Sequence, residues 1–205
     1  MAPMKVPDIV VGRLPLYLRS LTQMAEDGKK ITSSQELGGR LGISSAQIRK
    51  DLSQFGEFGK QGTGYQIIYL ADQIRKILRV EKIWDVVLVG SGDLGHAVAN
   101  YAGFLHRGFR IVSVYDNDPN KIGETIAKFT VKDVRQLKED IRAMEIKVAM
   151  LAVPAQQAQE VSDDLIAAGV EAILCYAPTS LTLPPQIKIQ YIDPVLHLQH
   201  MTYYL

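Results

Sequence analysis

Cysteine and long apolar runs are nearly absent from this sequence. Only Cys175 among the 205 residues is a cysteine, so an internal disulfide is impossible and most cysteine-based metal sites are excluded. No apolar run reaches the ~18 residues that a membrane-spanning helix needs. The first ten residues, MAPMKVPDIV, lack the apolar core of a signal peptide. We therefore expect a cytoplasmic protein that binds neither a membrane nor a metal.

Net charge is also small, but its distribution is uneven. Residues 1–80 contain 12 Lys and Arg against 7 Asp and Glu, whereas residues 81–205 contain 11 against 15. A basic front half joined to an acidic back half suggests that only the front half contacts a polyanion. Ordinary charge scatter is the alternative, and the charge alone does not decide between them.

The front half has the pattern of a helix-turn-helix. Leu14, Leu18, Leu21 and Ala25 recur at helical spacing and predict a first helix that ends near Gly28. Ser33 to Glu36 and Ser44 to Gln47 are capping-box patterns, each of which opens a further helix. Two capped helices separated by a short turn that contains glycine predict a helix-turn-helix.

The last of these helices is the predicted recognition helix. It buries Ile48, Leu52 and Phe55, and we expect Asp51 to face inward or toward the first helix. Its outer face then offers groups suited to phosphates and base edges, namely Ser45, Gln47, Arg49, Lys50, Ser53 and Gln54. The glycine-rich stretch 56–65 and the strand-like 66–69 predict a β-hairpin wing, with Lys60 on a phosphate. A short helix over 72–80 then closes the front half. A solvated helix face is the alternative for Arg49 and Lys50.

A glycine loop organises the second half. The apolar run Val86 to Val89 leads into Gly90-Ser91-Gly92-Asp93-Leu94-Gly95, and a helical pattern follows. In that context GxGxxG predicts a dinucleotide site, in which the pyrophosphate approaches the loop backbone and the helix N-terminus. Asp116 ends the next strand, 21 residues after Gly95, where an acid binds the adenosine ribose hydroxyls. Such a carboxylate repels a 2′-phosphate and favours NAD(H) over NADP(H).

Strands and helices alternate through the rest of the chain. Apolar strands are predicted at 146–153, 172–176 and 187–192, which indicates a doubly wound parallel sheet of the Rossmann type. Ligands bind at the carboxyl ends of such strands, which include Val153-Pro154. The apolar tail 194–205 must pack on something, such as a second subunit. We expect three parts: a winged-helix domain at 1–80, a Rossmann domain at 81–193 and a C-terminal helix at 194–205.

An enzyme is the competing interpretation, but no catalytic group stands out. No Ser/His/Asp or Cys/His arrangement is present, and His197 and His200 have no nearby acid to complete a metal site. The residues after the front domain leave no room for a separate substrate domain. The alternatives are a small NAD-dependent oxidoreductase with an N-terminal interaction module, or a CoA-binding module.

The block from Gln47 to Lys60, QIRKDLSQFGEFGK, together with Gly90 to Gly95, Asp116 and Val153-Pro154, resembles the redox-sensing repressors of the Rex family. The resemblance covers nearly the whole chain. It implies a non-enzymatic homodimer that binds a palindromic operator, is released by NADH but not by NAD⁺, and swaps its C-terminal helix between subunits. Asp93 departs from relatives that carry a basic residue in the loop, which would weaken pyrophosphate binding.

The same resemblance implies roles for three further residues. It places Tyr101 near the nicotinamide, and Arg19 and Asp193 in a switch in which Asp193 exchanges partners between subunits. The alternative is that Tyr101 belongs to the core, Arg19 is a solvated helix residue and Asp193 caps the tail helix before Pro194.

Overall fold

The computed structural model describes residues 6–59 and 63–205, and the chain forms two compact units, Met1–Lys82 and Ile83–Leu205. Lys60 therefore lies outside the described residues. Each unit has a hydrophobic core of its own.

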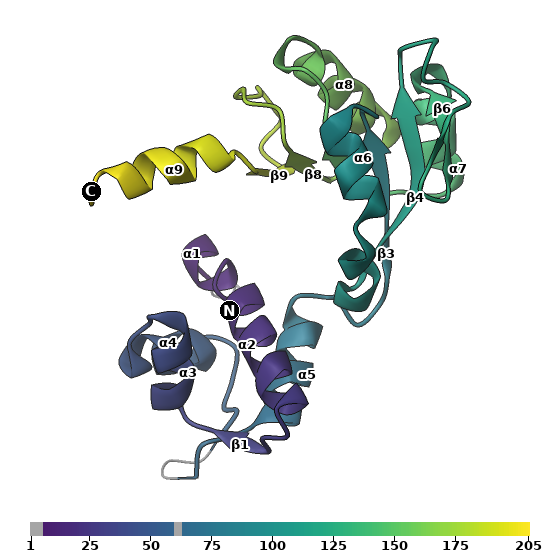
Figure 1. The fold of residues 1–205 in the computed structure, drawn as a ribbon. Coiled ribbons are helices and arrows are strands. Elements are labelled where there is room, and N and C mark those ends of the chain that lie inside the picture. The colour runs from purple at the N-terminus through teal and green to yellow at the C-terminus, as the bar shows by residue number, and fades with distance from the viewer. Residues whose placement is uncertain (1–5, 60–62) are drawn as a thin grey trace. The chain divides into compact units, whose positions relative to one another are not determined.

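The first unit is a helical bundle with a small two-stranded sheet (Figure 1). Its elements are α1 (Asp8–Val11), α2 (Leu14–Glu26), β1 (Ile31–Thr32), α3 (Ser34–Leu41), α4 (Ser45–Ser53), β2 (Tyr65–Gln66) and α5 (Ile67–Ile77). The core forms where α2 packs on α5, because Leu14, Leu21 and Met24 are fully buried at helical spacing.

The helix-turn-helix is confirmed, and its caps explain where the helices begin. The Ser33 Oγ accepts a hydrogen bond from the Glu36 N–H at 3.1 Å, and the Ser44 Oγ accepts one from the Gln47 N–H at 3.2 Å. Gly42 ends α3 with φ of 68°, a left-handed conformation that glycine adopts without strain. The turn between α3 and α4 is therefore built from the residues that the sequence pattern singled out.

Helix α5 corrects the sequence interpretation. We expected 66–69 to be strand-like and a short helix to begin at Asp72, but the helix begins at Ile67. The β-branched pair Ile67-Ile68 suggested a strand, yet Ile67, Leu70 and Ile74 share one fully buried helical face. Burial of that face against α2 outweighed the local strand preference.

The expected wing is present only in part. β2 pairs antiparallel with β1, which precedes α3, through Ile31 with Gln66 and Thr32 with Tyr65. The strands therefore join segments far apart in sequence, and the described residues of 56–69, namely 56–59 and 63–69, contain no strand pair of their own. Gly59 and Gly64 do lie close together, because a Cβ on Gly59 would lie 2.5 Å from the Gly64 carbonyl oxygen.

The second unit is a layered α/β domain (Figure 1). Its elements are β3 (Trp84–Val89), α6 (Asp93–Asn100), the 3₁₀ helix η1 (Ala102–Arg107), β4 (Phe109–Asp116), β5 (Thr125–Ile126), β6 (Phe129–Asp133), the 3₁₀ helix η2 (Val134–Gln136), α7 (Leu137–Ala143), β7 (Val148–Leu151), α8 (Ala155–Ala168), β8 (Ala172–Cys175), β9 (Lys188–Tyr191) and α9 (Pro194–Thr202).

The sheet has the order β5-β6-β4-β3-β7-β8-β9, and every pair except β5 with β6 is parallel. The parallel strands, counted along the chain, follow the 3-2-1-4-5-6 order of a doubly wound dinucleotide-binding fold. Along β3, Val87 and Val89 join the core that α7 and α8 cover, whereas Val86 and Leu88 join the core under α6. The predicted fold class is confirmed, although the β5–β6 hairpin was missed.

The tail forms a helix with no buried residue. α9 begins at Pro194, and Asp193 caps it by accepting a hydrogen bond from the Val195 N–H at 2.9 Å. Leu196 is 60% exposed and Met201 is 62% exposed, so the apolar side chains of this helix are uncovered within one chain. Among the described residues, no helix combines the length and apolarity needed to cross a membrane.

Candidate functional sites

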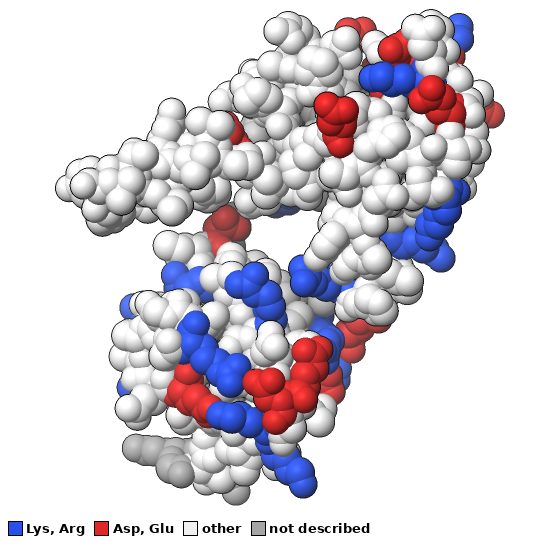
Figure 2. All heavy atoms as spheres, viewed as in Figure 1, with Lys and Arg blue, Asp and Glu red and all other residues white. Residues whose placement is uncertain are grey.

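The outer face of α4 presents basic side chains. Arg49, Lys50 and Ser53 are exposed, and the Arg49 Nη1 donates to the Ser34 Oγ at 3.1 Å. Figure 2 shows Lys and Arg intermixed with Asp and Glu over the visible face of this unit, so the charge there is mixed. The basic side chains of α4 thus lie on its outer face, and the surface around them carries both positive and negative charges.

The inner face of α4 holds a buried carboxylate. Asp51 is 0% exposed, as expected. Its Oδ2 accepts from the Arg13 Nε and the Tyr17 hydroxyl, both at 2.6 Å, and its Oδ1 accepts from the Arg13 Nη2 and the Gln47 Nε2, both at 2.7 Å. Burial alone would raise the pKa of Asp51, but the hydrogen bonds from Arg13, Tyr17 and Gln47 outweigh it and leave that pKa below its usual value.

Gln47 and Ser45 are therefore less exposed than we expected. Both side chains are half-buried, and the amide of Gln47 is held by Asp51 one turn later on the same face of the helix. The sequence pattern placed Gln47 outward because it is polar. The buried acid that binds its amide was recognised as inward-facing, but its link to Gln47 was not.

A hollow adjoins the outer face of α4. It has a volume of about 840 Å³ and lies between α3, α4 and the loop that leads to β2. Its lining includes Ser34, Arg49, Ser53, Gly56 and Tyr65. Two of the predicted DNA-contacting residues, Arg49 and Ser53, thus share one concave surface with backbone of the glycine-rich loop.

The glycine loop of the second unit has the geometry that its sequence predicts. Gly90 has φ of 100°, and a Cβ there would lie 2.2 Å from the Ala152 carbonyl oxygen of the neighbouring strand end. A Cβ on Gly95 would lie 2.0 Å from the Gly90 carbonyl oxygen, so α6 packs on the loop only because Gly95 has no side chain. Around Gly92, by contrast, the space is open, which leaves its backbone accessible to a ligand.

Asp116 lies at the end of β4 and is 8% exposed. Its Oδ2 accepts from the Ser91 N–H at 2.8 Å and the Ser91 Oγ at 2.6 Å, and its Oδ1 accepts from the Asp118 N–H at 2.9 Å. Burial would raise the pKa of Asp116, but the donors from Ser91 and Asp118 and the nearby Lys121 charge hold that pKa below its usual value. The carboxylate is therefore ionised, and it fixes the glycine loop to the second strand.

A groove of about 690 Å³ lies at the carboxyl ends of the strands, and of the predicted loop residues only Ser91 and Gly95 are not part of its lining. The lining brings together Gly90, Gly92, Asp93, Leu94 and Asp116 with Val153 and Pro154 across the point where the strand order reverses. The volume is within the range of ligand pockets, about 300–1,000 Å³. Open backbone at Gly92, at the N-terminus of α6, and a buried acid at a strand end fit a dinucleotide.

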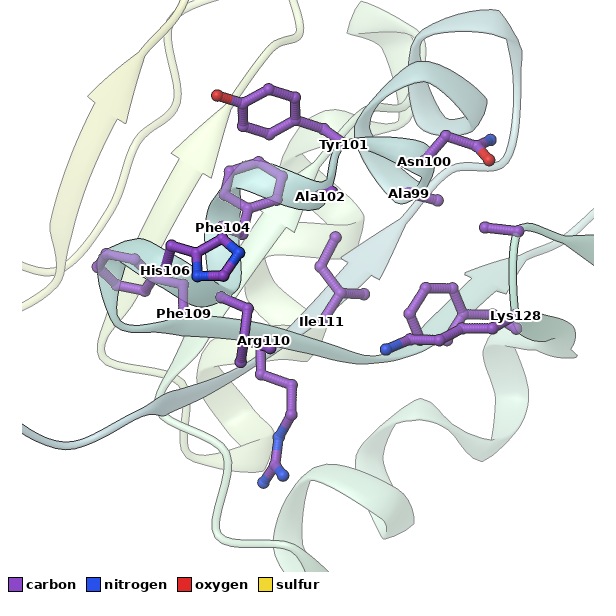
Figure 3. Close-up of a pocket in the computed structure, with 13 residues that line it drawn as sticks. Ala99, Asn100, Tyr101, Ala102, Phe104, His106, Phe109, Arg110, Ile111 and Lys128 are labelled. Atoms are coloured by element: carbon purple, nitrogen blue, oxygen red, sulfur yellow. The ribbon is translucent and has the colours of Figure 1, made fainter.

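Tyr101 lies outside that groove. It follows the last turn of α6 and lines a separate cavity of about 520 Å³ with Phe104, Phe109 and Phe129 (Figure 3). Its ring packs edge-on against Phe104, with centroids 5.1 Å apart, and the residue is 48% exposed. The alternative that Tyr101 belongs to the buried core is wrong, whereas a role at the nicotinamide stays a prediction.

The predicted switch residues have simple surroundings. Arg19 is an exposed residue of α2, and Asp193 is the cap of α9. Within one chain, Asp193 therefore caps the tail helix, as the alternative interpretation expected. Its role in a switch stays a prediction. In the described part of the chain, no three or more His, Cys, Asp or Glu side chains are grouped to hold a metal ion.

Sequence reasoning missed two groups. Arg13 and Tyr17 bind Asp51, and the signal for them was the acid that interrupts the basic run of the recognition helix. Lys121 lines the groove, with its Nζ 3.7 Å from the Asp116 Oδ2, and it lies in a turn-rich loop that gave no signal.

Two family descriptions match the chain. One, "Putative DNA-binding protein N-terminus", matches residues 5–53, and the other, "CoA binding domain", matches residues 81–179. The first covers the helix-turn-helix through the end of α4, and the second covers the glycine loop and most of the sheet.

Individual relatives match almost the full length. A protein named "Redox-sensing transcriptional repressor Rex" from Chloroflexus aurantiacus is 52% identical over 199 residues, which are 97% of this chain and 94% of the relative. A protein of the same name from Brevibacillus brevis is 42% identical over 201 residues, which are 98% of this chain and 97% of the relative.

Solved structures agree with these relatives. RSP in complex with beta-NAD+ and operator DNA is 33% identical, has a TM-score of 0.92, and is matched over 98% of this chain and 93% of that one. RSP in complex with beta-NADH is 31% identical, has a TM-score of 0.89, and is matched over 98% and 94% of the two chains. RSP is described as a Rex-family repressor.

Proposed function

Because the chain belongs to the family of redox-sensing transcriptional repressors called Rex, we propose that it binds operator DNA through its first unit and is released when its second unit binds NADH. It is a regulator and not an enzyme, as its relatives are repressors. The observation that carries the proposal is the similarity, at a TM-score of 0.92, to RSP bound to beta-NAD+ and operator DNA together.

For operator binding, we assign the contacts to α4 and the loop after it. Arg49, Lys50 and Ser53 are exposed on one helix face, with Ser45 at the helix start. Side chains of these kinds donate to phosphates and base edges in the major groove. The Gln47 Nε2 donates one hydrogen bond to Asp51, so we assign the DNA contact of Gln47 to the rest of its amide group. Lys60 supplies a phosphate contact.

The functional assembly in this proposal is a homodimer. Leu196, Leu198 and Met201 of α9 are each about 60% exposed, and an apolar helix left uncovered gains stability by packing on a second subunit. A two-fold dimer presents two recognition helices to a palindromic operator. We place the protein in the cytoplasm, where bacterial DNA lies.

For the dinucleotide, the loop Gly90–Gly95 takes the pyrophosphate and Asp116 takes the adenosine ribose hydroxyls. Ser91 holds Asp116 in place, while Val153 and Pro154 line the far side of the groove. Both NAD⁺ and NADH make these contacts, so they give affinity without discrimination. The ring itself differs, since the nicotinamide is cationic in NAD⁺ and neutral in NADH, and a pocket that closes over it favours the neutral form. We assign that role to Tyr101 from the family resemblance, although within one chain Tyr101 lines a cavity separate from this groove.

Release requires NADH to bind the released state more tightly than the DNA-bound state. A coupling of about 1–3 kcal/mol, typical of allostery, corresponds to about 5- to 150-fold in affinity. We propose that Arg19 and Asp193 carry this coupling through exchange of the partner of Asp193.

A CoA-binding role is the second candidate, because the second unit matches the CoA binding domain description. The groove argues against it: Asp93, Asp116, Asp118 and Glu160 line it, opposed by Lys121. CoA carries a 3′-phosphate on the ribose that Asp116 would meet, and NAD(H) carries none. A competition experiment in which CoA displaces NADH at equal concentration would favour this second candidate.

The proposed function is tested by titrating NADH into the free protein and into its complex with a duplex selected from random sequences. Linkage requires the complex to bind NADH more weakly, by the same factor by which NADH weakens DNA binding. Equal NADH affinity for the free protein and the complex would contradict the proposal.

A further inference from the structure

The side chain of Asp51 links the recognition helix α4 to α2. Each carboxylate oxygen accepts two hydrogen bonds, so the buried acid is fully satisfied. Arg13 immediately precedes α2 and Tyr17 lies in its first turn, whereas Gln47 and Asp51 belong to α4. The contacts between the two helices here are therefore polar and directional.

The hydrogen bonds to Asp51 fix the orientation of α4 relative to α2 as well as the distance between the two helices. Arg13 donates through Nε and Nη2 to different oxygens, and such a planar two-bond pair sets the relative orientation of its partners. The Tyr17 hydroxyl adds a third fixed direction from a ring that is 0% exposed. The apolar neighbours Ile48 and Leu52 pack α4 on the core, but dispersion contacts resist a small rotation of the helix about its axis less strongly.

Rotation of α4 matters for reading DNA. Arg49 and Lys50 adjoin Asp51 in the sequence and face outward, so any rotation of the inner face moves them by the same angle. Hydrogen bonds to base edges tolerate displacements of only about 0.5 Å. Attraction to the phosphates depends on distance much more weakly.

Resting on the proposed function, we propose that Asp51 is a positioning residue that, with Arg13 and Tyr17, sets the rotation of the recognition helix and thereby the preference for operator over unrelated DNA. Asp51 itself has no part in contacting DNA. Its carboxylate is covered on all sides by its four donors.

The test is the variant Tyr17→Phe, which removes one of these donors without changing charge or ring shape. Tyr69→Phe, at an exposed tyrosine of α5, is the matched control. We expect Tyr17→Phe to lower the ratio of operator to unrelated-duplex affinity by about fivefold, roughly the loss of one base contact. The affinity for the unrelated duplex and the slope of log K against log salt should stay unchanged, because the phosphate contacts remain.

A second variant separates positioning from stability. The triple substitution Arg13→Met, Tyr17→Phe and Asp51→Leu replaces the buried ion pair, and the buried hydroxyl that donates to it, by apolar side chains, a change that often leaves stability equal or higher. We expect this variant to melt no lower than the wild type and to lose operator preference. A triple variant that melts like the wild type and keeps the full preference would overturn the inference, as would an unchanged ratio in Tyr17→Phe. If the wild type itself prefers no duplex, the proposed function fails and this inference with it.

Discussion

Substitution of Asp116 by Asn tests the dinucleotide site at its most constrained group. The carboxylate accepts from the Ser91 N–H and Oγ on one oxygen and from the Asp118 N–H on the other. An amide has one accepting end, so whichever way it turns a backbone N–H faces its NH₂ group. A buried donor left unpaired costs about 1–3 kcal/mol.

The effect on binding follows from the same atoms. The ribose hydroxyls lose a charged acceptor, and hydrogen bonds to charged groups contribute about 1.5–3 kcal/mol. At tenfold per 1.4 kcal/mol, the affinity for NADH should fall roughly 10- to 100-fold. The difference between the affinities for NADH and for NADPH should become smaller as well, because the variant lacks the carboxylate that repels a 2′-phosphate.

Calorimetric titration of NADH and NADPH into Asp116→Asn measures both effects. Asp163→Asn is the matched control, since Asp163 is an exposed acid of α8 that does not line the groove. The affinity of the variant for operator DNA without dinucleotide should match the wild type. If Asp116→Asn bound NADH as tightly as the wild type does, the assignment of the ribose site to Asp116 would be wrong.

Three further predictions concern DNA binding, coupling and pH. Lys50→Ala should weaken binding to all duplexes about equally and lower the salt slope by about 1 in anisotropy titrations, whereas an unchanged slope would remove Lys50 from the phosphate contacts. Asp193→Ala should cost about 1 kcal/mol through loss of the α9 cap and keep NADH binding, but release of DNA by NADH should fail; intact release would exclude Asp193 from the switch. The folded-state pKa values of Asp51 and Asp116 lie below their unfolded values, so the stability they add is complete above about pH 4 and is lost as pH falls through the folded values. In thermal melts between pH 7 and pH 3, the melting temperature should therefore fall below about pH 4, and it should fall less in Asp51→Asn than in the wild type.

The glycine loop shows how far sequence reasoning reaches. Gly90 and Gly95 were predicted from their spacing after a strand, and the structure explains each by a carbonyl oxygen within 2.2 Å of where a Cβ would stand. Such constraints are local, because they depend on a strand, a turn and a helix that are adjacent in the chain. The capped helices of the helix-turn-helix were predictable for the same reason.

What the sequence did not reveal depends on contacts distant in the chain. The β-branched pair at the start of α5 resembles a strand until its burial against α2 is known. Arg13 and Asp51 are 38 residues apart, and the sequence indicated the direction in which Asp51 faces but not that Arg13 is its partner. Tyr101 sits beside the glycine loop in sequence, yet α6 carries it away from the groove to a separate cavity.

The most direct test of redox sensing keeps total dinucleotide and salt constant and varies only the NADH to NAD⁺ ratio. The anisotropy of a labelled operator, selected from random duplexes and bound by the protein, reports release. We predict that DNA is released as the ratio rises and stays bound when all the dinucleotide is NAD⁺. Binding that is indifferent to the ratio at every total concentration would contradict the account.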